Sequence, residues 1–217
     1  MNTTTTAPSP TRVPFSQTIR ESTTTDHRDA ERSPFMAALF ERSASLSAYT
    51  ALVQQQYLVY EVLEAASEHM ASDPVAGRFV HQELLRVPSL EADLAVLVGE
   101  HWRGRLEPTD ATLAYTERLR QVCFDWPGGF VAHHYTRYMG DLSGGQFIGR
   151  SVREQFGLSD AGASFYRFEG IADPGAFKER YRRELDAVPW DDSESARVVD
   201  EVHRAYQHNA ELLASIG

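Results

Sequence analysis

Residues 137–150, RYMGDLSGGQFIGR, carry four glycines inside a segment that the flanking residues predict to be helical. Each glycine in a helix interior costs about 1 kcal/mol relative to alanine, so the four together cost about 4 kcal/mol. Folded domains are stable by only about 5–15 kcal/mol, so such a helix must gain something from bare backbone. We expect 128–156 to form one long helix that is broken or bent at its glycines, with Gly140 and Gly144 on one face.

Three interpretations of the glycine pattern compete. Small residues four apart let two helices approach closely, but this packing is most typical of membranes and the chain has no predicted span. A phosphate-binding loop is disfavoured because no strand is expected before the segment and the Lys-Ser/Thr motif is absent. The third interpretation is a kinked helix that lays bare backbone against a broad flat ligand, with Asp141 ordering water for proton delivery. From the residues alone, helix packing and ligand contact stay equally open.

The composition is that of an acidic globular protein. The 217 residues include 42% hydrophobic and 11% aromatic residues, and the net charge is −10. This charge argues against a nucleic-acid binder, because phosphate binding needs a basic face. Cys123 is the only cysteine of the chain. It excludes a disulfide framework and a cysteine metal cage, and it indicates a reducing, cytoplasmic setting.

The chain reads as one folded domain after an N-terminal tail. Residues 1–14 are rich in Thr, Pro and Ser and are expected to be disordered, which leaves 15–217 as the domain. No window is apolar enough for a membrane span, and no hydrophobic tail ends the chain, so we expect a soluble protein without a membrane anchor. No feature of the sequence demands a partner chain, and we expect a monomer.

Helical periodicity is clear in several segments. Apolar residues recur at helical spacing in 46–70, in 108–122 and in 192–216. In 108–122, Thr109 is the expected N-cap and the apolar residues are Leu113, Tyr115, Leu119 and Val122. The one strand-like stretch, 164–170, is short. We therefore predict an all-α, single-domain fold of about seven or eight helices.

If the flat ligand is a haem, its iron needs an axial ligand, usually a histidine. His27 stands out among eight histidines because the predicted helix 14–33 places it on a face whose neighbouring residues are small and polar, which leaves room for a ring system. Glu31 lies one turn further along and could fix the imidazole tautomer. His133 and His134 are alternatives on the glycine helix itself, but one helix cannot readily supply both faces of a haem.

Three segments together resemble the haem oxygenase family. YTRYMGDLSGGQ at 135–146 is similar to its distal helix, HRDAE at 27–31 to its proximal helix, and FKERYRREL at 177–185 to its propionate-binding segment. The resemblance runs from about residue 15 to 216. It implies an all-α haem oxygenase-like fold with haem sandwiched between a proximal and a distal helix.

The resemblance also implies the reaction. Haem b, both cofactor and substrate, is opened oxidatively at a meso carbon, expected to be α, to biliverdin, carbon monoxide and ferrous iron. O₂ is consumed, and the electrons come from an external donor such as a ferredoxin or a flavoprotein reductase. The missing membrane anchor points to a soluble bacterial-type enzyme that serves iron acquisition or bilin supply.

Residue roles follow from the same resemblance. His27 is implied as the axial ligand of the haem iron and Glu31 as its hydrogen-bonding partner. The residues implied on the distal side are Asp141, acting through ordered water, with Gly140, Gly144, Gly145 and Arg137. The further haem-binding residues implied are Arg20, Tyr135, Lys178, Arg182, Tyr206 and Asn209.

Lys178 is the only lysine of the chain. With Arg182 and Arg183 it forms a cationic face that could neutralise two propionates. The same rim, extended by Arg20 and Arg137, is predicted to be a basic docking patch for an acidic electron donor.

Two residues depart from the family pattern, and one other function stays open. Met139 stands where leucine is common and Phe147 where a smaller apolar residue is frequent, and we expect both to be tolerated packing changes. The alternative function is a haem storage or delivery protein without turnover. Such a protein would need His27 but neither Asp141 nor the glycine-rich helix, so the intact GDLSGG motif weighs against it.

Overall fold

The computed structural model describes residues 13–216, apart from the side chains of Ala30 and Glu31. Over this part of the chain it contains helices and turns but no strand, which confirms the all-α prediction. Ten α-helices form in the described residues: α1 (Phe15–Ser22), α2 (Thr24–Glu31), α3 (Pro34–Phe40), α4 (Leu46–Met70), α5 (Val87–Leu97), α6 (Asp110–Val122), α7 (Pro127–His134), α8 (Gly140–Phe156), α9 (Pro174–Asp186) and α10 (Asp192–Ala214). Shorter turns are η1 (Ala76–Phe79), η2 (Gln82–Leu84), η3 (Trp102–Arg105), the π-helical η4 (Tyr135–Met139) and η5 (Ser164–Tyr166). Of the tail predicted at 1–14, residues 1–12 lie outside the described part.

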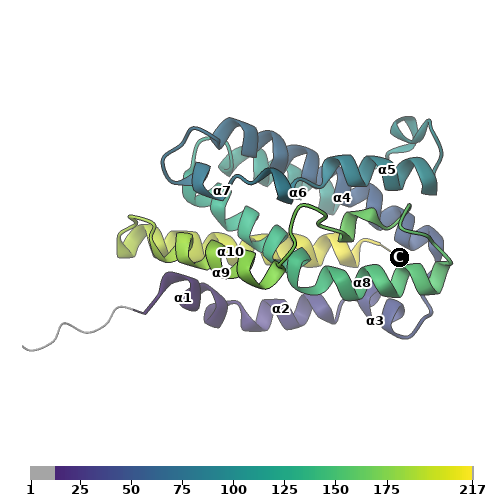
Figure 1. The fold of residues 1–217 in the computed structure, drawn as a ribbon, viewed down its shortest axis with the longest axis horizontal. Coiled ribbons are helices and arrows are strands. Elements are labelled where there is room, and N and C mark those ends of the chain that lie inside the picture. The colour runs from purple at the N-terminus through teal and green to yellow at the C-terminus, as the bar shows by residue number, and fades with distance from the viewer. Residues whose placement is uncertain (1–12, 217) are drawn as a thin grey trace, which may run out of the picture.

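The helices lie in layers around α10. Figure 1 shows α1, α2 and α3 following one another along the lower edge, with α9 and α8 above them and α4 to α7 in the upper part. Helix α10 runs through the middle and packs against α7, α2 and α6. In this view α2 and α8 both lie below α10, and residues of these two helices line the candidate site.

Two predicted helices are each divided, which explains why ten helices form instead of seven or eight. The segment 14–33 breaks at Thr23, whose hydroxyl donates to the Ile19 carbonyl at 2.8 Å and ends α1. The segment 128–156 is interrupted by η4, one turn before the first glycine, and not at the glycines themselves. Within η4 the Thr136 hydroxyl donates to the carbonyl of Ala132 at 2.9 Å, a side-chain bond that competes with regular helix geometry. The strand-like stretch 164–170 forms the turn η5.

The predicted periodicity matches burial in most helices. Helix α4 keeps the predicted bounds, and its buried predicted residues are Tyr49, Leu52, Val53, Tyr57, Tyr60 and Leu63. Thr109 caps α6 as predicted, since its hydroxyl accepts from the Thr112 amide at 3.2 Å. Leu113 belongs to the predicted apolar run of this helix but is 51% exposed, whereas Tyr115 and Leu119 are buried.

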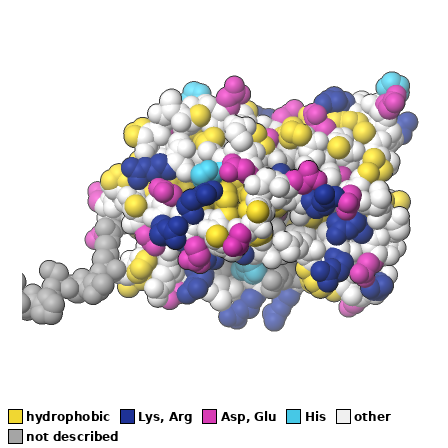
Figure 2. Space-filling model, in the orientation of Figure 1, with side chains coloured by type: hydrophobic (Ala, Val, Ile, Leu, Met, Phe, Trp, Pro, Cys, Tyr) yellow, Lys and Arg dark blue, Asp and Glu magenta, His cyan; other side chains and the backbone are white. Residues whose placement is uncertain are grey.

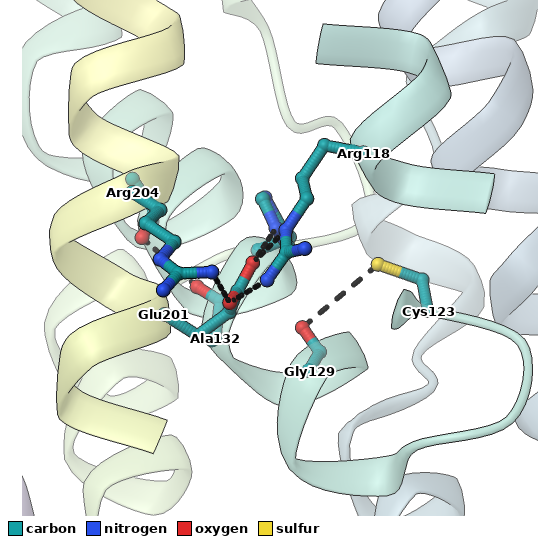
Figure 3. Close-up of polar contacts among 8 residues, drawn as sticks. Arg118, Cys123, Gly129, Ala132, Glu201 and Arg204 are labelled. Carbon is teal, nitrogen blue, oxygen red and sulfur yellow. Dashed lines mark hydrogen bonds and ion pairs between the residues drawn. The ribbon is translucent and has the colours of Figure 1, made fainter. Parts of the chain in front are cut away.

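A buried ionic cluster joins α10 to α6 and α7. Glu201 of α10 accepts from Arg118 Nε of α6 at 2.8 Å and pairs with His133 Nε2 of α7 at 3.0 Å. Figure 3 shows the two arginines, Arg118 and Arg204, converging on this carboxylate. Burial alone would raise the pKa of Glu201, but the bonds from His133 and Arg118 outweigh it and lower that pKa to about 2. Nearby, the Cys123 thiol is buried and lies 3.8 Å from the Gly129 carbonyl oxygen.

Candidate functional site

Two adjoining cavities of about 390 and 360 Å³ lie between α2 and α8. The residues that border both are His27, Gly140, Ser143 and Tyr206. We call them the cationic cavity and the inner cavity. The cationic cavity is also lined by Arg20, Thr23, Thr24, Arg28, Tyr135, Met139, Lys178 and Arg182. The inner cavity is also lined by Met36, Phe40, Leu52, Gln56, Thr136, Arg137, Asp141, Gly144, Phe147, Ile148, Phe165, Tyr166, Asn209 and Leu213.

His27 lies on one wall of this space. It belongs to α2, its ring centroid is 6.4 Å from that of Tyr206, and it borders both cavities. Helix α2 is held to α10 by Asp26, whose carboxylate is 2.9 Å from His203 Nδ1. The side chain of Glu31 lies outside the described residues, so its pairing with His27 stays a prediction.

The opposite wall is bare backbone. A Cβ placed on Gly140 or Gly144 would meet no atom within 4 Å, because both glycines face the cavities. On the other side of α8, a Cβ on Gly149 would lie 2.7 Å from Cβ of Tyr166, and one on Gly145 would lie 3.4 Å from the same ring. One face of α8, at Gly140 and Gly144, therefore borders open space. Another face, at Gly145 and Gly149, packs closely against Tyr166.

Gly145 does not take the predicted place beside the ligand. It is buried against Tyr166 and lines neither cavity. The reason is helix geometry, because successive residues point about 100° apart and only Gly140 and Gly144 share the open face.

Asp141 is a half-buried residue whose carboxylate lies at the edge of the inner cavity. Its side chain accepts a hydrogen bond from the Tyr60 hydroxyl of α4. Burial raises the pKa of Asp141, while the charge of Arg137 and the bond from Tyr60 oppose that rise. Burial and the neighbouring Asp141 place the pKa of Tyr60 well above its ordinary value. The pair can thus hold one proton next to the bare wall.

Arg137 is fixed on three sides. Its guanidinium donates to the side-chain oxygens of Gln56 and Asn209, and it lies 5.0 Å from the ring centroid of Tyr60. Only 4% of Arg137 is exposed. The prediction that Arg137 belongs to an electron-donor docking patch is therefore wrong, because a guanidinium buried among these partners is not on the surface.

The cationic cavity collects positive charge. Arg20 and Arg28 reach it from the first two helices, and Lys178 and Arg182 reach it from α9. Lys178 Nζ is 3.3 Å from the Ser143 hydroxyl, which ties α9 to α8. Figure 2 shows Lys and Arg side chains gathered over α9 on the face turned to the viewer. Arg183, predicted to share this role, is exposed and does not line the cavity.

The two alternative histidines are core residues. His133 and His134 are 0% and 2% exposed, and neither lines a cavity of the site. His133 bonds Glu201, and His134 Nδ1 lies 2.9 Å from the Tyr181 hydroxyl. Burial lowers the pKa of His134 to about 3, so it is neutral in the fold.

Sequence reasoning missed several residues of the site. The polar ones are Arg28, Gln56, Tyr60 and Ser143. One signal was available, because Gln56 lies four residues from both Leu52 and Tyr60 on the apolar face of 46–70, where a polar side chain needs a partner. The apolar wall of Met36, Phe40 and Phe165 comes from separate segments, and no local pattern brings these together.

The residues that line the site fit a haem. His27 and the bare backbone of Gly140 and Gly144 border the same space, as an axial ligand and a flat ring require. The cationic cavity is lined by four basic residues: Arg20, Arg28, Lys178 and Arg182. Their positive charge matches the two carboxylates that haem carries at one edge. Among the described residues, no group of three or more His, Cys, Asp or Glu side chains could hold a metal ion by itself.

Comparisons with known proteins agree with this fit. The Heme oxygenase family model matches residues 13–215. Heme oxygenase 1 of Synechocystis sp. is 35% identical over 200 residues, which cover 92% of this chain and 83% of the relative. Heme oxygenase 1 of Nostoc sp. is 33% identical over 199 residues, which cover 91% of this chain and 84% of the relative.

Solved structures give the same answer. The crystal structure of heme oxygenase-1 from Synechocystis sp. in complex with heme has a TM-score of 0.90 and 34% identity, covering 94% of this chain and 92% of that one. Heme oxygenase from Leptospira interrogans has a TM-score of 0.89 and 30% identity, covering 94% and 100%. Within residues 13–216, every helix is too short or too polar to cross a membrane. The chain belongs to the haem oxygenase family.

Proposed function

We propose that this protein opens haem b at a meso carbon, the α position, and releases biliverdin, carbon monoxide and ferrous iron. O₂ and electrons from an external donor are consumed. The observation that carries the proposal is the arrangement across the cavity: His27 stands on one wall, and the bare backbone of Gly140 and Gly144 stands on the other beside Asp141.

Three groups of residues would bind the haem. His27 supplies an imidazole nitrogen as axial ligand, with Glu31 as the partner expected from sequence. Arg20, Lys178 and Arg182 neutralise the two propionates, joined by Tyr135, Tyr206 and Asn209 around the ring. Because the propionates would fix how the ring is seated, the same cations would decide which meso carbon is attacked.

Bound haem supplies the iron at which O₂ is reduced and the ring that is opened. The protein's part at this wall is to keep other chemistry away. Gly140 and Gly144 leave open space and present no acid or base, and among the described residues that line the inner cavity it is Asp141 that supplies a carboxyl. Burial raises its pKa, so the carboxyl holds a proton more readily than an exposed aspartate and can return it through water, as a general acid requires.

The electron donor is expected to be an acidic protein such as a ferredoxin or a flavoprotein reductase. The chain is acidic overall, yet Arg20, Arg180 and Arg183 are exposed around the cationic cavity and α9. A local basic area of this kind steers an acidic partner. Charge reversal at Arg180 and Arg183 should lower donor-dependent turnover and its salt dependence, whereas unchanged values would remove this docking role. The single buried cysteine favours a reducing, cytoplasmic setting, and we expect a monomer.

A hemin titration followed by reduction in air tests the function. We expect a Soret band on addition of hemin, and its replacement by bilin absorbance after reductant is added. His27→Ala should weaken the Soret complex, while His101→Ala, a change at an exposed histidine on η3's cap, should not. Absence of a Soret band would refute haem binding, and a complex that stays stable under reductant would support the storage or delivery alternative.

A further inference from the structure

Helix α2, which carries His27, packs against α10 without an apolar face among its described residues. The described side chains, 24–29, are all polar, and none of them is buried. A helix of eight residues is marginal in water, and most helices in proteins are stabilised by an apolar face packed on the core. The position of α2 against α10 therefore depends on other contacts.

The elements on either side of α2 are anchored. Before it, Ile19 of α1 is fully buried, and the Thr24 hydroxyl donates back to the Arg20 carbonyl at 2.9 Å. After it, Ser33 caps α3, whose Phe35 is buried in the core. These contacts fix the two ends of α2 and leave its rotation about its own axis to contacts made along its length.

One contact along the length of α2 is the bond between Asp26 and His203 of α10. The Asp26 carboxylate accepts from His203 Nδ1 at 2.9 Å, and the two side chains are 31% and 38% exposed, which shields the bond from water more than a fully exposed pair. The ring of His27 lies 6.4 Å from that of Tyr206, which follows His203 by one turn of α10. Two adjacent residues of α2 thus meet two residues one turn apart on α10.

The bond of Asp26 sets the direction of the next side chain. Successive residues of a helix point about 100° apart, so holding Asp26 against α10 leaves His27 turned to the inner cavity. A rotation of α2 that broke the bond would turn the imidazole away from the bare backbone of α8. An axial imidazole has to keep one ring nitrogen aimed at the iron, and hydrogen-bonded neighbours commonly fix that orientation.

We propose that the Asp26–His203 bond is a latch that fixes the rotation of α2 and so positions His27 for the haem iron. Neither Asp26 nor His203 lines the cationic or the inner cavity, so both act through the helix that they hold. They are positioning residues. The inference rests on the proposed function, because it takes His27 as the axial ligand.

His203→Ala tests the latch from α10, because it removes the bond without altering α2. In the protein without haem, we expect the backbone amides of 24–31 to exchange hydrogen about three- to tenfold faster than in wild type. Mass spectrometry measures this rate, and unchanged exchange in α4 shows that the variant is folded. His203→Asn keeps an N–H donor near the place of Nδ1 and should restore the wild-type rate. His101→Ala, the same change at an exposed histidine outside α10, is the matched control.

With hemin bound, the latch should be visible at the iron ligand itself. We expect His203→Ala to lose hemin to an acceptor protein about three- to tenfold faster than wild type. The iron–imidazole band in the resonance Raman spectrum of the reduced complex, assigned by its loss in His27→Ala, should shift or broaden. A bond that only stabilised the fold would leave this band in place, and His203→Asn should keep it.

The outcomes separate this inference from the proposed function. A band that stays in place in His203→Ala, or amides of α2 that exchange at the wild-type rate, would overturn the latch. So would His203→Asn or His101→Ala behaving like His203→Ala. If wild type itself shows no iron–imidazole band, the axial ligand of the proposed function is refuted instead.

Discussion

The glycines of α8 act in two ways that a substitution to alanine separates. Gly140 and Gly144 face open space, so a methyl group there meets no protein atom. Gly149 lies so close to Tyr166 that a methyl group would force one of them to move. The same residue type thus leaves open space at two positions and permits close packing at another.

We predict opposite stability changes for the two substitutions. Gly144→Ala should raise the free energy of unfolding by up to about 1 kcal/mol, since alanine favours the helix. It should also weaken haem binding, because the methyl group enters the cavity. Gly149→Ala should lower the free energy of unfolding by about 1–3 kcal/mol through overpacking. Urea unfolding and hemin titration measure both, and a Gly144→Ala protein that binds haem as tightly as wild type would remove the ligand role of that glycine.

Tyr60 tunes the proton affinity of Asp141. Its hydroxyl stabilises the ionised carboxylate, so Tyr60→Phe should raise the pKa of Asp141 further. The limb of the pH–rate profile that reports this carboxyl should then move to higher pH. Tyr57→Phe, which removes a hydroxyl bonded to Glu61 one turn earlier on α4, is the control and should leave the profile in place. A shift of equal size in both variants would assign the limb to another group.

At the scale of elements, α3 and α8 meet through two exposed phenyl rings. Phe40 and Phe147 are 49% and 57% exposed, their ring centroids are 5.4 Å apart, and both border the inner cavity. Phe147 was expected to be a tolerated packing change. In the structure its ring, on α8, contacts the ring of Phe40 on α3.

We predict that this aromatic contact slows the loss of bound haem. Phe147→Ala should speed haem transfer to an acceptor protein, and Phe40→Ala should do the same, with little added effect when both are combined. Because both rings are exposed, the free energy of unfolding should fall only by about 0.5–1.5 kcal/mol. Leu113→Ala, at a similarly exposed residue of α6, is the control. Additive effects of the two substitutions would show that the rings do not act as a pair.

Element boundaries show what the sequence can and cannot predict. Apolar periodicity placed α4 correctly, and Thr109 marked the start of α6. The π-helical turn at 135–139 was not predicted, because period analysis assumes one constant number of residues per turn. That turn changes the phase of the helix before Gly140, and phase decides which glycines face the ligand. The place expected for Gly145 came from the family resemblance, and within α8 it points about 100° away from Gly144, toward Tyr166.

At the scale of the whole molecule, buried groups with shifted pKa values set the acid stability. His134 is buried and neutral with a pKa of about 3, below its ordinary 6.5. The unfolded chain therefore binds a proton below pH 6.5 that the folded chain does not, and the free energy of unfolding falls as pH drops from 6.5 toward 3. Glu201, whose pKa falls from 4.5 to about 2, adds a further loss between those values.

This stability profile is testable by urea unfolding between pH 7 and 3. Glu201→Gln should remove the part of the pH dependence that lies below pH 4.5, and it should lower the free energy of unfolding at pH 7 because Arg118 loses its buried partner. Glu211→Gln on the same helix, where the carboxylate is half exposed, is the control. A wild-type profile that stays flat across this range would contradict the assigned charge states.

The site as a whole was predictable to the extent that it follows short motifs. The segments at 27–31, 135–146 and 177–185 named His27, Asp141 and most of the cationic end, and the structure brings them around one space. The apolar wall of the inner cavity could not be predicted. It forms where α3, α4 and the segment after α8 come together, and no single stretch of sequence contains all of these residues.

The proposed reaction and the role of Asp141 are both tested by the yield of bilin from one equivalent of bound hemin that is reduced in air. We predict that wild type converts nearly all of its bound haem, whereas Asp141→Ala binds hemin with an unchanged Soret titration but yields much less biliverdin. Equal bilin yields from the two proteins would refute the role of Asp141, and haem that stays intact in wild type would refute the proposed reaction.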